Sequence, residues 1–111
     1  IMVGADRVCV NGDFANKIGT YEKALLARKH QIPFYVAFPE TTFDRSCTSG
    51  EEIPVEIRDG REVSELSGER ISPEGCSAFN PAFDITPSVY VTGYITEKGI
   101  LTSDELASHL Q

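Results

Sequence analysis

The sequence predicts an α/β fold with a parallel sheet flanked by helices. Two short apolar runs, residues 1–5 and 32–38, are typical of strands that are covered on both faces. The intervening residues 17–30 have the spacing of an amphipathic helix. A strand, a helix and a second strand in this order predict two parallel neighbours joined by a crossover. Because 111 residues leave room for one hydrophobic core, we expect a single domain over residues 1–111.

The helix expected over residues 17–30 has one apolar face and a definite end. Apolar side chains recur along it every three or four residues, at Ile18, Tyr21, Ala24 and Leu25. Pro33 ends the helical pattern, because the residue before a proline is driven toward extended geometry. We therefore expect this face to pack on the sheet.

The next segment predicts one more strand and a long connection. Ile53, Val55 and Ile57 alternate with proline and charged residues, which is typical of a half-exposed strand. Turn chemistry at Ser49-Gly50 and Asp59-Gly60 bounds this strand.

The last thirty residues predict two helices with a short strand between them. Thr86-Pro87 is a helix start signal, because proline is tolerated at the first helical position, and Gly99 is the expected stop. Residues 100–101 are expected to form a short strand. Ser103 is expected to cap a final helix that has acidic residues in its first turn.

Composition and charge exclude several classes of protein. Lys and Arg number 10 against 17 Asp and Glu, a formal net charge of −7, whereas a nucleic-acid-binding face must be basic. The longest apolar run, residues 32–38, contains Pro33 and is far shorter than the ~20 residues that span a bilayer. Residues 1–4 carry no charged leader, so we expect no secretory signal.

The cysteines predict a reduced, intracellular protein. Cys9, Cys47 and Cys76 form an odd set without a CxxC pair. This pattern fits inert buried or half-buried thiols better than a disulfide framework or a zinc site. We therefore expect no metal site and a cytoplasmic location.

Asp6 is the first candidate for chemistry. It lies where the first apolar run ends, and ligands of open α/β sheets bind beyond the carboxyl ends of the strands. A carboxyl group acts as a proton donor near neutral pH only where dry surroundings keep it protonated. Adjacent side chains of a strand face opposite ways, so Arg7 need not pair with Asp6. The plainer interpretation is a turn aspartate in a salt bridge.

The stretch that follows has the composition of an anion site. Asn11-Gly12 marks a tight turn, Asn16 is a candidate cap for the next helix, and Gly19 would permit close approach of a backbone or a phosphate. Lys17 adds a cation near free helix N–H groups. A capped, glycine-permitted turn explains the same residues, and neither GxGxxG nor GxxxxGK[ST] is present, so a dinucleotide is not expected.

Several segments together resemble the methylthioribose-1-phosphate isomerase family. They are GADRV, NGDFANKIGTY, IPFYVAFP, SGEEIPVE and FNPAFDITP in this order, and the resemblance runs from Gly4 to about Gly99. The resemblance implies a Rossmann-like carboxyl-terminal lobe of a larger protein, with an amino-terminal helical lobe and an upstream catalytic Cys motif that these residues lack. It also implies a homodimer, neither a metal nor a nucleotide cofactor, and a place in methionine salvage.

The resemblance assigns roles to three residues. Such an enzyme converts 5-methylthioribose 1-phosphate into 5-methylthioribulose 1-phosphate. The Asp of GADR is the family's catalytic proton donor, which is Asp6 here, and the Asn-Lys pair of ANKIGTY binds the substrate, which is Asn16 and Lys17 here. Because the catalytic Cys motif is missing, we expect the 111 residues alone to be inactive.

Two related functions compete with this one. The regulatory subunits of translation initiation factor 2B have a similar loop and helix start, but usually depart from GADR at Asp6 and Arg7. Ribose-1,5-bisphosphate isomerase would need a second cationic site, for which the acidic carboxyl-terminal half offers no obvious candidate. Phe79, Phe83 and Tyr90 either meet a second copy in a homodimer or fill the domain's own core.

Overall fold

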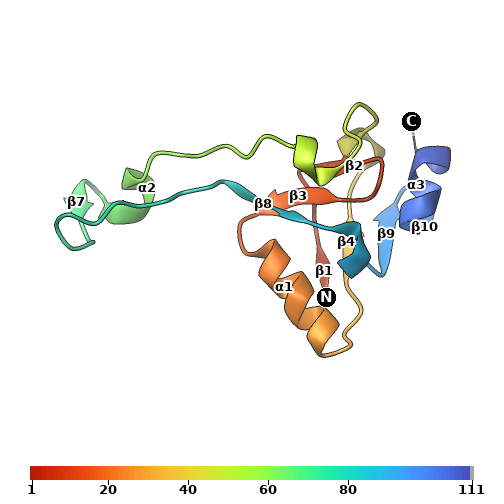
Figure 1. Cartoon of the computed structure of the whole chain (residues 1–111), viewed down its shortest axis with the longest axis horizontal. Helices are drawn as coiled ribbons and strands as arrows, with labels where there is room; N and C mark the ends of the chain where they lie inside the picture. The colour runs from red at the N-terminus through yellow and green to blue at the C-terminus, as the bar shows by residue number, and fades with distance from the viewer. Residues whose placement is uncertain (111) are drawn as a thin grey trace.

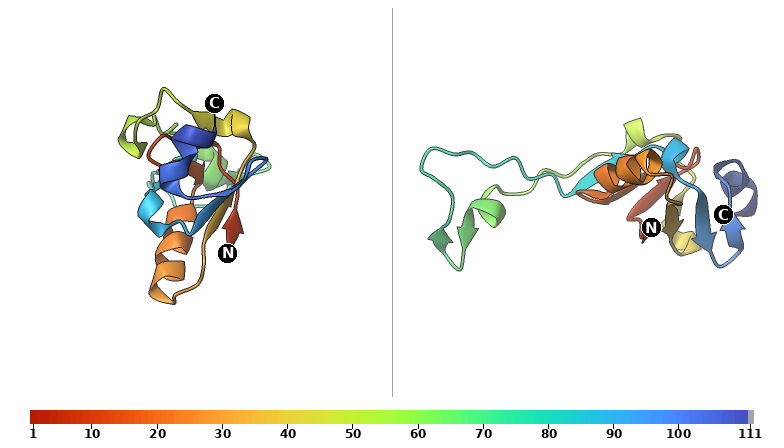
Figure 2. Two further views of the ribbon diagram at one scale, coloured as in Figure 1. Left: turned by 90° about the vertical axis from the view of Figure 1, so that its right-hand side faces the viewer. Right: turned by 90° about the horizontal axis from the view of Figure 1, so that it is seen from below.

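The computed structural model describes residues 1–110 as a packed lobe with a long projecting arm (Figure 1). The lobe consists of two four-stranded sheets, helix α1 and a carboxyl-terminal helix α3. The arm is residues 54–81, and the views in Figure 2 show it leaving the lobe as two extended segments. The mixed α/β class expected from the sequence is confirmed.

The first sheet contains the predicted strand, helix and strand. Its order is β1-β4-β9-β10, with parallel pairing of β1 to β4 and of β4 to β9. The strands are β1 (Met2–Val3), β4 (Tyr35–Ala37), β9 (Gly93–Thr96) and β10 (Gly99–Leu101). Helix α1 (Thr20–Lys29) lies in the connection between β1 and β4. The parallel neighbours predicted from the two apolar runs are therefore confirmed.

The second sheet was not expected. Its order is β5-β2-β3-β8, with β2 parallel to β5 and the other pairs antiparallel. The strands are β2 (Arg7–Cys9), β3 (Phe14–Lys17), β5 (Phe43–Asp44) and β8 (Phe83–Thr86). The hairpin of β2 and β3 is inserted between β1 and α1. These strands are too short for their alternation to separate them from a loop.

Helix α1 buries only part of the predicted face, since Ala24 is buried and Tyr21 is half-buried as expected. Thr20, Ala24 and Ala27 are buried, whereas Ile18 and Leu25 remain 48% and 40% exposed. The helix begins at Thr20 and packs on β8 and on η3 (Ser88–Tyr90), so its inward face is set by small residues that permit close approach.

The helix predicted from Thr86-Pro87 to Gly99 is wrong. Residues 83–101 instead form β8, the 3-10 turn η3, and the antiparallel pair of β9 and β10. The β-branched residues of this segment favour strands, and Thr86 is fully buried in a ladder opposite Phe14. The short strand expected at residues 100–101 is confirmed within β10.

The final helix is confirmed, with its cap one residue earlier than expected. α3 spans Ser103–His109, and its N-cap is Thr102. Thr102 forms a reciprocal capping box with Glu105, whose Oε2 accepts from the Thr102 N–H at 2.8 Å.

The strand predicted over Ile53, Val55 and Ile57 is also wrong. Residues 50–52 form the 3-10 turn η2 (Gly50–Glu52), and the chain then runs out along the arm with one isolated bridge between Ile57 and Pro81. The arm ends in a helical turn α2 (Arg61–Ser64) and the two-stranded β6 (Glu65–Leu66) and β7 (Glu69–Arg70). Without a third strand or a packed face, alternation along this segment does not make a sheet.

The core lies entirely in the lobe and joins both sheets to both longer helices. Its buried side chains include Phe14 and Val8 from the second sheet, Val36 and Tyr94 from the first, and Leu106 from α3. The radius of gyration is 16.3 Å, whereas a compact domain of this length has about 13 Å, and the difference comes from the arm. Within residues 1–110, no helix has the length and apolarity to cross a membrane.

Candidate functional site

Asp6 lies in the turn between β1 and β2, at the carboxyl end of β1, as the sequence predicts. Its backbone N–H donates to the carbonyl oxygen of Ala15 at 2.8 Å, which keeps Asp6 beside the strand that carries Asn16 and Lys17. The Asp6 side chain is exposed. The dry surroundings that a proton donor needs are therefore not supplied by these residues alone.

Two hollows meet at Asp6 and Arg7. The first, which we name the loop hollow, has a volume of about 520 Å³ and is lined by Asp6, Arg7, Thr41, Thr42, Phe43, Asp44, Arg45 and Ser46. The second, which we name the arm-base hollow, has a volume of about 170 Å³ and is lined by Asp6, Arg7, Ala15, Ile53, Pro54 and Phe83. The loop hollow is mostly polar, whereas four of the six residues around the arm-base hollow are apolar. Asp6 can therefore face a polar and an apolar part of one ligand at the same time.

Arg7 pairs with Asp44 and leaves the Asp6 carboxylate unpaired among the described residues. Arg7 Nη1 lies 3.4 Å from Asp44 Oδ2. Asp44 Oδ1 also accepts from the Ser46 hydroxyl at 2.6 Å and the Ser46 N–H at 2.9 Å. These hydrogen bonds from Ser46, and then the charge of Arg7, hold the pKa of Asp44 below its usual value. The interpretation of Asp6 as a salt-bridged turn residue is wrong.

Asn16 and Lys17 lie at the end of β3, and Asn16 does not cap α1. Asn16 Nδ2 donates to the Thr20 hydroxyl at 3.0 Å, and that hydroxyl donates to the Lys17 carbonyl at 2.7 Å. The N-cap of α1 is Gly19, whose φ of 98° lies in the left-handed region. The Lys17 side chain is exposed, so its ammonium is available to a ligand.

An internal carboxylate occupies the amino end of α1. Asp84 Oδ2 accepts from the N–H groups of Gly19 at 2.8 Å and Tyr21 at 3.1 Å. Asp84 comes from β8, where it lies opposite Asn16 in the ladder. The prediction that this helix end receives a phosphate is therefore wrong, because its donors already hold an anion.

Asp13, directly after the Asn11-Gly12 turn, has a structural role that the sequence did not indicate. The Asp13 carboxylate accepts from the N–H groups of Ser88 at 2.9 Å and Gly50 at 3.0 Å, and from Asn11 Nδ2 at 2.8 Å. Burial raises the pKa of Asp13, but these three donors outweigh it and the net pKa is lowered from 3.8. Asp13 thereby joins the hairpin, η2 and the start of η3, which lie far apart in sequence.

Gly12 is required at this turn by both its backbone and its neighbours. Its φ is +86°, and an added Cβ would lie 2.5 Å from the Tyr94 hydroxyl. That hydroxyl donates to the Gly12 carbonyl at 2.7 Å. Burial, and then the nearby charge of Asp13, raise the pKa of Tyr94, so it stays protonated and can keep donating.

The expectation of three reduced, buried thiols is wrong. Cys9 and Cys47 form a disulfide with a Cα–Cα distance of 4.9 Å, and Cys76 is free but exposed. β2 and β5 pair in parallel next to Arg7, which brings Cys9 near the loop that carries Cys47. The spacing of 38 residues gave no sign of this pair, because disulfide connectivity depends on tertiary contact.

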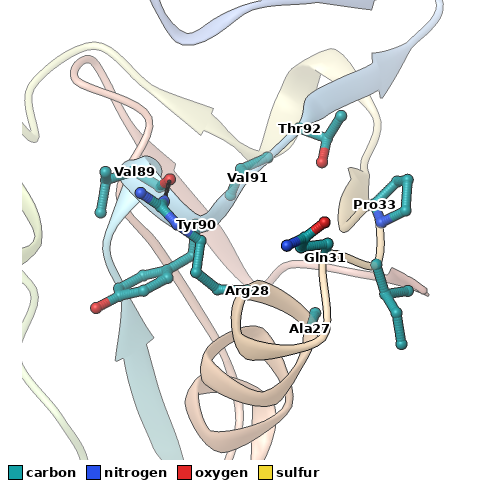
Figure 3. A pocket seen from close by; sticks show the side chains of 9 residues that line it. Ala27, Arg28, Gln31, Pro33, Val89, Tyr90, Val91 and Thr92 are labelled. Carbon is teal, nitrogen blue, oxygen red and sulfur yellow. Dashed lines mark hydrogen bonds between the residues drawn. The ribbon is translucent and has the colours of Figure 1, made fainter.

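A further hollow lies away from Asp6, between the end of α1 and η3 (Figure 3). Its volume is about 330 Å³. Arg28 reaches from α1 toward Val89 and Tyr90, donates to the Val89 carbonyl at 2.6 Å, and lies 5.7 Å from the centre of the Tyr90 ring. The charged group of this hollow is thus already engaged. Among residues 1–110, no cluster of three or more His, Cys, Asp or Glu side chains could hold a metal ion.

A family model for the initiation factor 2 subunit family matches residues 1–103. The chain belongs to this family. Its relatives include proteins named methylthioribose-1-phosphate isomerase and a protein named 5-deoxyribose 1-phosphate isomerase. The first, from Pelotomaculum thermopropionicum, is 57% identical over 101 residues, and the second, from Moorella thermoacetica, is 59% identical over 101 residues. The resemblance seen in the sequence motifs is confirmed.

The chain matches only one part of these relatives. It spans 28% and 29% of their lengths, although 91% of the chain is covered in each case. A 5-methylthioribose 1-phosphate isomerase from Pyrococcus horikoshii superposes with a TM-score of 0.90 at 47% identity, over 97% of this chain and 31% of that one. The delta subunit of translation initiation factor eIF-2B from A. fulgidus superposes with a TM-score of 0.85 at 40% identity, over 96% and 31%.

Proposed function

We propose that a full-length protein containing this chain is an aldose–ketose isomerase that converts 5-methylthioribose 1-phosphate into 5-methylthioribulose 1-phosphate, in methionine salvage. The observation that carries this proposal is Asp6, an unpaired carboxylate at the carboxyl end of β1 where two hollows meet. The names of the relatives that match most of the chain support the same reaction.

The reaction needs one proton donor and no outside oxidant. Protonated Asp6 gives its proton to the ring oxygen of the sugar, and the bond between that oxygen and C1 breaks. The C2 hydrogen then moves to the electron-deficient C1 as a hydride, with the two electrons of the C2–H bond, and the C2 hydroxyl loses its proton as the ketone forms. The Asp6 carboxylate takes that proton back, so atoms and charge balance over one turnover. Asp6 must be protonated at the start, which requires a cover that excludes water.

Asn16 and Lys17 contact the sugar phosphate in this proposal. The exposed ammonium of Lys17 supports it, because the strand that carries Lys17 is tied to Asp6 by the hydrogen bond to Ala15. The amide of Asn16 is held by Thr20, which fixes its direction. Lys17 then acts as a point charge toward the phosphate, without help from the helix end that Asp84 occupies.

The remaining part of such a protein supplies what the chain lacks. We propose that these residues are a Rossmann-like carboxyl-terminal lobe and that an amino-terminal lobe with the catalytic Cys covers Asp6. The parallel strands β1, β4 and β9, with α1 in a connection, support the Rossmann-like part. The 111 residues alone are then inactive, and turnover by them would contradict the proposal that the amino-terminal lobe is needed for activity.

A homodimer in the cytoplasm completes the proposal. Phe79 of the arm is 80% exposed, where a second copy would cover it, while Phe83 and Tyr90 are half-buried in the lobe. Sedimentation of the full-length protein with Phe79→Ser tests the homodimer, since the dimer should weaken.

The proposed cytoplasmic location rests on the sugar phosphate chemistry alone. The cysteines no longer support it, because Cys9 and Cys47 form a disulfide and are not reduced thiols.

The two competing functions are less well supported. A doubly phosphorylated sugar needs a second free cation, but Arg7 pairs with Asp44, and Arg45 donates to the carbonyls of Ala107 and Leu110. A regulatory subunit without activity needs no unpaired carboxylate between two hollows. Its fold is nevertheless the same, as the A. fulgidus delta subunit shows.

Conversion of 5-methylthioribose 1-phosphate to the ketose by the full-length protein tests the proposal. Asp6→Asn should lower the rate of conversion by a factor of ~10³ or more, because an amide cannot give a proton to the ring oxygen and take one back. Asp104→Asn is the matched control, since Asp104 is an exposed aspartate in the first turn of α3. A folded wild-type protein without conversion would move the assignment to the regulatory function.

A further inference from the structure

We propose that Asp84 is a positioning residue for binding of the sugar phosphate. From β8 its carboxylate holds the turn that joins β3 to α1. Within that turn, the hydroxyl of Thr20 holds both Asn16 and Lys17. This inference rests on the proposed function, which places Asn16 and Lys17 on the substrate. Asp84 acts through these residues and does not itself contact the sugar.

Asp84 holds the turn at the two residues that flank Thr20. Its Oδ2 accepts from the N–H groups of Gly19 at 2.8 Å and Tyr21 at 3.1 Å. The N-cap residue of α1 is Gly19, which makes no side-chain cap of its own. A cap from within the turn would stabilise the helix but leave its start free to move against the sheet. An acceptor on β8 instead fixes the start of α1 to the strand beside it.

The Thr20 hydroxyl transmits this position to the two proposed binding residues. Thr20 is only 4% exposed, so its hydroxyl serves the interior and not a ligand. It donates its single hydrogen to the Lys17 carbonyl at 2.7 Å and therefore accepts from Asn16 Nδ2 at 3.0 Å. The Asn16 amide must then turn its Oδ1 away from Thr20. One buried hydroxyl thus sets the direction of this amide and the place of the Lys17 backbone.

Strand β8 aligns the same residues from the other side. It runs along β3 and packs on α1 (Figure 1), and Asp84 lies directly opposite Asn16 in the ladder. β3 ends at Lys17, and beyond it the Ile18 N–H reaches the Ala82 carbonyl only at 3.4 Å. The shorter contacts to Asp84 therefore decide where the chain leaves the strand. Such control matters, because misplacing a binding group by about 1 Å can cost as much as ~10²-fold in rate.

The test measures KM and kcat of the full-length protein with 5-methylthioribose 1-phosphate. Asp84→Ala should raise KM about tenfold and leave kcat per folded enzyme within about twofold, because Asn16 and Lys17 bind the substrate without transferring its proton. Asp84→Asn keeps an oxygen for the N–H groups of Gly19 and Tyr21, and should bring KM back to within about threefold of the wild type. A variant that is merely less stable contains less active enzyme but has the KM of the wild type.

Thr20 tests the route by which Asp84 acts, and it serves if Asp84→Ala does not fold. Thr20→Val keeps the shape without the hydroxyl and should raise KM about tenfold, whereas Thr20→Ser keeps the hydroxyl and should not. Because both residues act through one hydroxyl, Thr20→Val and Asp84→Ala together should raise KM about tenfold, and not the ~100-fold of independent effects. An increase near ~100-fold overturns this route.

Asp13→Ala is the matched control. Asp13 also accepts from backbone N–H groups of two distant segments, at Gly50 and Ser88, but within residues 1–110 its carboxylate makes no hydrogen bond to the turn between β3 and α1. It should lose stability and keep the KM of the wild type. An unchanged KM in folded Asp84→Ala, or an equal rise in Asp13→Ala, overturns the inference and leaves the proposed function standing. If the wild type converts no substrate, the proposed function is wrong and this inference fails with it.

Discussion

The lobe and the arm use similar side chains with opposite results. Every buried apolar residue lies outside residues 54–81, whereas Ile57, Leu66, Ile71 and Phe79 of the arm are 57%, 66%, 64% and 80% exposed. The lobe brings several segments together so that each apolar side chain has neighbours on all sides. The arm is two extended segments and a small hairpin, which cannot surround anything. Apolar residues therefore form a core only where the topology encloses them.

The two regions also use carboxylates differently. In the lobe, Asp13 and Asp84 accept from backbone N–H groups of distant segments and so fix the tertiary structure. In the arm, Asp59 and Glu62 pair with arginines two and four residues away. Local pairs between exposed side chains stabilise little, since water and salt screen them. Stability is therefore expected to reside in the lobe.

Truncating one phenylalanine in each region gives the largest contrast. Phe14 is fully buried, with its ring centre 6.5 Å from that of Phe34, and Phe14→Ala should lower the free energy of unfolding by about 4 kcal/mol. Phe79→Ala should change it by no more than about 0.5 kcal/mol, because Phe79 is 80% exposed. Urea denaturation of the 111-residue chain measures both. A loss of several kcal/mol in Phe79→Ala would show that the arm is part of the cooperative core.

The same contrast explains what the sequence could predict. The strands around residues 1–5 and 32–38, and the helix between them, depend on local apolar patterns, and the structure contains them. The position of Asp6 at the end of β1 follows from these elements. Predicting this position did not depend on the second sheet.

The errors occur where a distant residue decides the local structure. Asp84, 65 residues from Gly19, takes the helix donors that the sequence offered to a phosphate. Thr86-Pro87 is a helix signal until the β3 ladder holds Thr86 as a strand residue. Cys9 and Cys47 meet only because β2 and β5 pair. The strand predicted at the base of the arm is wrong for the opposite reason, since Ile53, Val55 and Ile57 have a strand pattern but bridge to another segment only at Ile57 and Pro81.

Replacing Asp13 tests how firmly its carboxylate holds the lobe together. Asp13→Asn should lower the free energy of unfolding at pH 7 by about 2 kcal/mol, since the amide leaves an N–H of Gly50 or Ser88 without an acceptor and the site is partly solvated. Glu74→Gln, which neutralises an exposed arm residue, is the control and should have no effect.

The pH dependence of this difference has a definite sign. The pKa of Asp13 is lowered in the folded state from 3.8, so its contribution is fully present above the unfolded pKa and is lost as pH falls through the folded pKa. The destabilisation caused by Asp13→Asn should therefore shrink below pH 3.8, in urea denaturation repeated across pH. A difference that stays constant into strong acid would mean that charge contributes nothing to the Asp13 contacts.

The smallest effect is expected from an ion pair of the arm. Arg58 donates from Nε and Nη2 to the two carboxylate oxygens of Glu62, both at 2.8 Å. These hydrogen bonds, and then the charge of Glu62, raise the pKa of Arg58. Since no core lies beneath this pair, Arg58→Gln should leave the unfolding midpoint of the lobe unchanged and speed hydrogen exchange at the arm's own amides, such as that of Ile71, which donates to Ser64. High salt should mimic the substitution, because the pair is exposed.

Lys98→Gln is the control. It removes a 3.8 Å pair with Glu40 in the lobe and should leave hydrogen exchange in the arm unchanged. A lower unfolding midpoint in Arg58→Gln would mean that the arm and the lobe unfold as one unit, and that the contrast between them is one of shape and not of stability.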